Sequence, residues 1–288
     1  MQPVVVGLIG LALLFAGLMF GKDIALFNPK GLIAQGQARL MMFSVTVLLA
    51  VAIPTLSVLY FFAWKYRETN KQAKRNAKPR LGKFSTLSLW VIPTIMVAVV
   101  AFVALPATYK LDPHKALASD TKPLTIQVIA MRWKWLFIYP ERGIATVNYV
   151  QIPVDTPVEF KLTADEAPMN SFWIPHLGGQ LYAMTGHDNR VNLMADTPGE
   201  YMGQAAEING PGFAGMKFIA KASSDQEFNQ WVQMVQQSSN VLSSEEYNRL
   251  LAPSEDNRVT VYSRPEANLY HTVLMKYQDY QHQTMEMP

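Results

Sequence analysis

Two long apolar stretches dominate the first third of the chain, and neither residues 40–64 nor residues 84–109 include a charged side chain. Each stretch is longer than the roughly 20 residues that a helix needs to cross about 30 Å of hydrocarbon. Tyrosine and tryptophan lie near the ends of both, where a membrane meets water. The pattern predicts a transmembrane helical hairpin within residues 24–110.

The segment between these stretches, residues 65–83, carries eight lysines and arginines and one acidic residue, Glu68. Short basic loops stay on the cytoplasmic side of a membrane, so everything after Tyr109 is expected on the opposite side. In a bacterium this places the rest of the chain in the periplasm, as part of a multi-pass protein of the inner membrane. The same basic residues could also contact anionic lipid headgroups, which would leave the orientation unchanged.

The first 23 residues form a separate apolar segment. Residues 4–20 are about as long as the core of a signal peptide, but no basic residue precedes them. Two interpretations stay open for residues 1–23: a signal that is not of the lipoprotein type, or an additional uncleaved hydrophobic segment.

From residue 124 onward the pattern changes to short runs in which apolar and polar residues alternate, which is typical of half-buried strands. Turn sequences rich in glycine and proline separate these runs. The clearest alternating runs are residues 124–128, 158–162 and 191–195, and the clearest turns are residues 140–143, 155–157, 197–199 and 210–212. Many short strands with frequent turns predict a β-sandwich or Greek-key barrel over residues 111–222.

The last segment, residues 223–288, is predicted to be a helical, aromatic-rich extension. Ser224 and Glu227 have the spacing of a capping box, as do Ser243 and Glu246. Apolar residues follow Ser224 at helical spacing, which indicates an amphipathic helix whose apolar face packs against the barrel or a partner.

Composition narrows the function. The chain has no cysteine, which excludes thiol catalysis and thiolate metal sites. The part after residue 111 carries an excess of acidic residues, which argues against a nucleic-acid partner. No phosphate-binding glycine loop or nucleophile elbow is present. Adjacent acidic pairs such as Asp165 and Glu166 are expected to be solvated loop residues.

The glycine-rich stretch from Tyr201 to Met216 is predicted to be a strand end, a loop and the start of another strand. Its core, Gly-Gln-Ala-Ala-Glu-Ile-Asn-Gly, resembles the copper loop of subunit II of the haem–copper oxidases, which has the pattern Gly-Gln-Cys-x-Glu-x-Cys-Gly-x-x-His-x-x-Met. Upstream, Asn-Ser-Phe-Trp-Ile-Pro at residues 170–175 resembles a motif that opens with histidine in that family. The matched positions are Asn170, Ala205, Glu207, Asn209, Phe213 and Met216.

At these positions the family's metal-binding side chains are replaced. Ala205 and Asn209 stand where the family has bridging cysteines, whereas Asn170 and Phe213 stand where it has histidines. A pair of copper ions needs soft thiolates and imidazoles, and a single thioether cannot hold it. The chain therefore resembles the copper-free subunit II of quinol oxidases of the cytochrome bo type, over residues 24 to about 277.

This resemblance implies a membrane-anchored all-β protein, in which a transmembrane hairpin precedes a cupredoxin-like Greek-key barrel and C-terminal helices. It implies a subunit of a proton-pumping terminal oxidase that reduces O2 with electrons from membrane quinol. Haems and copper would lie in the partner subunit I, with other small membrane subunits alongside. The chain itself would hold no cofactor, would not receive electrons from cytochrome c, and would serve assembly and stabilisation.

The resemblance suggests roles for four further residues. Trp133 falls at the electron-entry position of copper-bearing relatives; without copper, Trp133 and Trp135 are interpreted as packing the barrel against its partner. Glu207 matches a glutamate that reaches magnesium in those relatives, and a structural hydrogen bond at the interface is the alternative. Thr86 stands where many relatives carry a glutamate at the mouth of a proton channel.

Two other functions stay open. A cytochrome c oxidase subunit II would need thiolates, which this chain lacks. The second alternative is a membrane-tethered cupredoxin-like binding module that works outside an oxidase. Such a module would be purified without haem-bearing partners.

Overall fold

The computed structural model describes residue 17 and residues 24–72, 82–119 and 121–285, with the side chains of the last helix described as far as residue 278. Most of the signal-like segment and the centre of the basic loop lie outside the described residues. The chain forms two compact units, of which residues 38–111 make the smaller. The predicted domain boundaries at residues 23, 110 and 222 stay predictions.

The smaller unit consists of the predicted pair of long apolar helices. Helix α2 spans Leu32–Lys65 and helix α3 spans Lys83–Lys110, with mean hydropathies of 2.3 and 2.4 in their most apolar windows. Both are long and apolar enough to cross a membrane. They end within one residue of the predicted limits, but α2 begins eight residues earlier than expected.

The early start of α2 has a physical reason, because its first turn belongs to the larger unit. Gly31 forms an isolated bridge with Ala195, and the backbone N–H of Ala34 donates to the carbonyl of Leu177 over 3.1 Å. A Cβ atom at Gly31 would lie 2.6 Å from the carbonyl oxygen of Met194, so only glycine allows this approach. Because these contacts are made by backbone groups, the hydropathy of the side chains does not indicate them.

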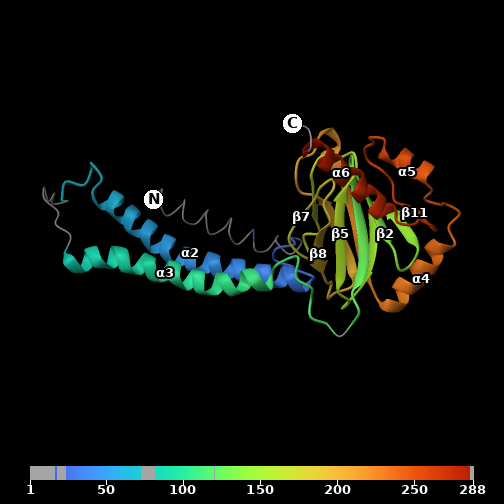
Figure 1. The fold of residues 1–288 in the computed structure, drawn as a ribbon. Helices are drawn as coiled ribbons and strands as arrows, with labels where there is room; N and C mark the ends of the chain where they lie inside the picture. The colour runs from blue at the N-terminus through green and yellow to red at the C-terminus, as the bar shows by residue number, and fades with distance from the viewer. Residues whose placement is uncertain (1–16, 18–23, 73–81, 120, 286–288) are drawn as a thin grey trace. The chain divides into compact units, whose positions relative to one another are not determined.

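The larger unit is a sandwich of two sheets (Figure 1). The first sheet has the order β11–β3–β2–β1–β5–β8, with bounds Thr260–Tyr262, Ile144–Val147, Lys134–Tyr139, Leu124–Met131, Val158–Ala164 and Asn189–Leu193. The second has the order β4–β10–β9–β6–β7, with bounds Tyr149–Pro153, Lys217–Ser223, Gly199–Ala205, Asn170–Trp173 and Leu181–Ala183. β1 pairs with β5 and β4 with β10 in parallel; the other pairs are antiparallel. The three predicted alternating runs fall on β1, β5 and β8.

The core between the sheets is aromatic. The ring of Phe172 stacks on that of Phe218 at 5.2 Å, and Trp135 meets both rings edge-on. All three side chains are at most 2% exposed. Burial of such large rings is the main source of stability for the sandwich.

The C-terminal extension contains α4 (Asp225–Gln236), α5 (Ser244–Leu251), β11 and α6 (Leu269–Met285). In this extension, α5 and α6 cover the outer face of the first sheet, whereas the apolar face of α4 packs on the core between the sheets. The hydroxyls of Ser224 and Ser243 accept from the backbone N–H groups three residues later, which confirms both predicted caps. Because apolar side chains of α6 pack on β1–β3, these strands are buried on both faces. Figure 1 shows α6 lying across this sheet.

Candidate functional site at the loop end of the sandwich

The loop of residues 206–216 connects β9 to β10, as the sequence predicts. Its second half is a short 3₁₀ helix, η2 (Pro211–Gly215). The backbone N–H of Ala205 donates to the carbonyl of Met216 over 3.0 Å, which closes the loop at its base. This closure brings the positions matched to copper ligands close together.

Three of those positions form one polar cluster. The side-chain N–H of Asn209 donates to the side-chain oxygen of Asn170 and lies 3.0 Å from the sulfur of Met216. The amide of Asn170 in turn donates to the carbonyl of Pro168 over 2.6 Å. Asn170 and Met216 are fully buried. The buried side-chain oxygen of Asn209 has no hydrogen-bond partner in the part of the chain that the structure describes.

The other two matched ligand positions are apolar. Ala205 is buried, and Phe213 is half-buried against the core of the sandwich. Neither side chain carries an atom that can donate electrons to a metal.

A pair of copper ions does not fit this set of side chains. Two amides and one thioether lie together, whereas bridged copper needs two thiolates and imidazole nitrogens. Among the described residues, no group of three or more His, Cys, Asp or Glu side chains could hold a metal ion. The side chains of Asn170, Asn209 and Met216 are instead hydrogen-bonded to one another.

Trp133 lies in the tight turn between β1 and β2 with a positive φ of 63° and packs over this loop. A Cβ atom at Gly212 would lie 2.5 Å from its indole ring, and one at Gly210 would lie 3.1 Å from it. The two glycines therefore let the ring lie directly on the loop backbone. Trp135, two residues later, has no exposed surface. Of these two tryptophans, only the half-buried Trp133 has surface left for an interface.

The remaining predicted residues are exposed. Glu207 projects from the loop beside Ile208, whose side chain is 81% exposed. In the other unit, Thr86 lies in the first turn of α3, where its hydroxyl donates to the carbonyl of Gly82 over 3.3 Å.

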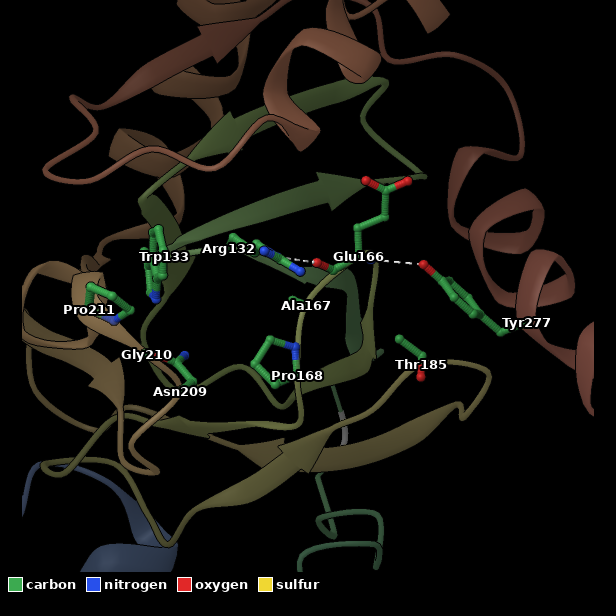
Figure 2. Close-up of a pocket in the computed structure, with 10 residues that line it drawn as sticks. All are labelled: Arg132, Trp133, Glu166, Ala167, Pro168, Thr185, Asn209, Gly210, Pro211 and Tyr277. Atoms are coloured by element: carbon green, nitrogen blue, oxygen red, sulfur yellow. Dashed lines mark hydrogen bonds between the residues drawn. The ribbon is translucent and has the colours of Figure 1, made fainter.

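A cavity of about 740 Å³ opens beside the loop (Figure 2). Five segments supply its walls: the β1–β2 turn, the loops after β5, β7 and β9, and helix α6. The lining residues are Arg132, Trp133, Glu166, Ala167, Pro168, Thr185, Asn209, Gly210, Pro211 and Tyr277.

Asp165 lies behind this cavity and is 1% exposed, so the expectation that it is solvated is wrong. Its carboxylate accepts from the hydroxyls of Tyr247 and Tyr277 and from Lys276 Nζ, which lies 2.9 Å away. Burial raises the pKa of both tyrosines, and the neighbouring carboxylate adds to this. Burial alone would lower the pKa of Lys276, but hydrogen bonds to Asp165 and Glu166 raise it well above its ordinary value. All three partners come from the C-terminal extension. The extension therefore covers the carboxylate and supplies the hydrogen bonds that a buried charge needs.

Lys134 is a second charged residue that the pattern does not reveal. It is 2% exposed, and its Nζ donates to the carbonyls of Leu250 and Ala252 over 2.8 and 2.9 Å. Burial lowers the pKa of this ammonium. The lysine caps the carboxyl end of α5, where the helix dipole favours a positive charge.

Comparisons with known proteins agree with this architecture. The family described as cytochrome c oxidase subunit II, periplasmic domain, matches residues 141–223. The family described as COX aromatic rich motif matches residues 236–281. The cytochrome bo(3) ubiquinol oxidase subunit 2 of Pseudomonas putida is 42% identical over 91% of this chain and 83% of its own length.

The chain belongs to the ubiquinol oxidase subunit 2 family. The ubiquinol oxidase subunit 2 of Acetobacter aceti is 41% identical over 90% of this chain and 85% of its own. Among solved structures, the periplasmic domain of subunit II of cytochrome oxidase of Bradyrhizobium japonicum is 24% identical, with a TM-score of 0.39, over 42% of this chain and 96% of that one. As a ubiquinol oxidase subunit 2, the chain is a membrane-anchored subunit of an oxidoreductase complex with a cupredoxin-like sandwich.

Proposed function

We propose that this chain serves a proton-pumping quinol oxidase that reduces O2 to water with electrons from membrane quinol. The names of its relatives support the quinol as the electron donor. The observation that carries the proposal is the cluster of Asn170, Asn209 and Met216, because the residues matched to copper ligands bond to one another. In this proposal the chain has lost the copper site through which cytochrome c would deliver electrons.

The proposed work of the chain is assembly and stabilisation of the catalytic subunit. Haems, copper and the quinol site then lie in the partner subunit I, with other small membrane subunits beside it. The two apolar helices supply the contacts within the bilayer. The basic loop between them supports a cytoplasmic position for the loop and a periplasmic one for the sandwich.

Trp133, Glu207 and the exposed Ile208 mark the proposed contact surface with subunit I. Glu207 and Ile208 are exposed, Trp133 is half-buried, and their position at one loop end supports this assignment. Glu207 is available either as a magnesium ligand or as a hydrogen-bond acceptor there, since magnesium needs only one or two protein carboxylates. Magnesium analysis of the complex with wild-type chain and with Glu207→Ala separates the two: an unchanged content removes the metal role.

The test uses the complex purified through this chain. The expected preparation contains haem, oxidises quinol, fails to oxidise cytochrome c, and has no near-infrared band of paired copper. Oxidation of cytochrome c would instead make the chain a subunit of a cytochrome c oxidase. Purification without any haem-bearing partner would favour a membrane-tethered binding module.

Deletion of the chain tests its assembly role separately. We expect a sharp fall in the amount of assembled catalytic subunit in the membrane, measured from the haem spectrum. A fully assembled and fully active oxidase in the deletion strain would refute the role.

A further inference from the structure

Helix α6 is bonded to two different loops at the same end of the sandwich. Toward the loop after β7, the hydroxyl of Tyr270 donates to Asp188 over 2.8 Å, and the side chain of Gln278 donates to the carbonyl of Gly186 over 3.3 Å. Toward the loop after β5, Lys276 and Tyr277 bind Asp165. Four side chains of one helix therefore hold both loops.

The contacts continue from Asp165 to the next residue, Glu166, which has a positive φ of 49°. Its backbone N–H donates to the hydroxyl of Tyr277 over 2.8 Å, and its carboxylate accepts from Lys276 over 3.1 Å. Its carbonyl accepts from Arg132 Nε over 2.8 Å, as Figure 2 shows. Glu166 thus joins α6 to the β1–β2 turn.

That turn also carries Trp133, whose ring covers Gly210 and Gly212 in the 206–216 loop. A continuous set of contacts thus leads from Tyr277 through Glu166 and Arg132 to this loop. The same residues line the open cavity of about 740 Å³.

We propose that α6 is a clamp that fixes the loop end of the sandwich, and that its hold reaches the 206–216 loop through Glu166, Arg132 and Trp133. This gives the aromatic-rich extension a task of its own: it orders the loops around the cavity. The proposal rests on contacts within the chain and does not depend on which reductant the complex uses.

The clamp is tested by amide hydrogen exchange on the full chain in its purified membrane complex. Tyr277→Phe keeps the ring but removes its hydrogen bonds to Asp165 and Glu166. We expect exchange in residues 165–167, which Tyr277 binds directly, and in residues 207–212 to become about ten-fold faster, because hydrogen bonds to a charged group are lost. Strands β4 and β10 should exchange as in the wild type. The matched control is Lys217→Met, which removes an exposed lysine next to the loop.

Two results would overturn the clamp: unchanged exchange in both loops of Tyr277→Phe, or equal acceleration throughout β4 and β10. The second result would mean that the helix stabilises the whole sandwich rather than its loop end.

A double-mutant cycle tests the path to the 206–216 loop. Arg132→Gln should accelerate exchange in residues 207–212 but not at Glu166, whose backbone N–H stays bonded to Tyr277. Adding Tyr277→Phe to Arg132→Gln should then accelerate only residues 165–167. Fully additive effects of the two substitutions on residues 207–212 would refute the path through Arg132.

Discussion

The side-chain amide of Asn209 donates a hydrogen bond to the side-chain oxygen of Asn170, a residue 39 positions earlier in the chain. The two residues occupy positions matched to a cysteine and a histidine of the copper-bearing oxidases. Asn209 belongs to the loop after β9 and Asn170 begins β6. The hydrogen bond therefore connects the segments that a shared metal ion would otherwise join.

Asn170→Ala should destabilise the sandwich. The substitution removes the fully buried amide of Asn170, so the half-buried amide of Asn209 loses this acceptor and the carbonyl of Pro168 loses its donor, which costs about 1–3 kcal/mol. We expect a lower midpoint of thermal unfolding for the chain in its complex. The control is Asn229→Ala, which removes an exposed asparagine of α4 that donates to Asp225. Equal midpoints for both variants would contradict a structural role of the amide pair.

Gly212→Ala should displace Trp133, since the new Cβ atom would lie 2.5 Å from the indole ring. Such overpacking costs roughly 1–3 kcal/mol. Truncating the ring in Trp133→Ala should remove most of this penalty. The measurement is a double-mutant cycle in thermal or chemical unfolding. A penalty of the same size in both backgrounds would mean that the ring does not restrict the loop.

The contacts around Asp165 should weaken in alkali. Tyr247 and Tyr277 titrate at about 10.0 when unfolded, and both have a raised pKa in the folded chain. Lys276 has an ordinary pKa of 10.5, which folding also raises. In each case the folded chain keeps a proton that the unfolded chain loses, so the stability that these three groups contribute is fully present below about pH 10 and is lost above it.

Unfolding of the chain measured from pH 8 to pH 11 checks this. The loss of stability above pH 10 should be smaller in Tyr247→Phe, which removes one of the titrating phenols. A wild-type stability that rises above pH 10 would contradict the assigned protonation states.

Thr86→Val should leave oxidase turnover unchanged. The hydroxyl of Thr86 already donates to the carbonyl of Gly82 within its own helical turn, as expected of threonine in an apolar helix. Valine has nearly the same shape and removes only that hydroxyl. Steady-state quinol oxidation is the measurement, and a clearly slower variant would mean that the hydroxyl takes part in proton delivery.

Much of the fold could be predicted from local pattern. Charge-free runs gave both helices, alternation located β1, β5 and β8, and the spacing of Ser224 and Glu227 located α4. These features depend on neighbours within a few residues, so the sequence displays them directly. The 206–216 loop could be located because glycine and proline mark turns.

Features that depend on distant partners could not be predicted. Nothing near Asp165 indicates that Lys276 and Tyr277, more than a hundred residues later, will bury it. The early start of α2 likewise depends on Leu177 and Ala195. Lys134 stands between two tryptophans, where a charged residue would be expected to face solvent. Its side chain is instead buried, and its Nζ donates to carbonyls at the carboxyl end of α5. For the candidate site, the resemblance identified the matched positions. The hydrogen bonds among these residues could not be predicted from it.

The pairing of β11 with β3 has a consequence for biogenesis. Thr260–Tyr262 comes near the end of the chain, whereas its partner strand Ile144–Val147 lies near the middle. During synthesis, the backbone of β3 presents an open edge until residues 260–262 have been made, and open edges invite pairing with other chains. A premature stop before residue 260 would therefore yield a product prone to aggregation and degradation, even though every other strand had been made.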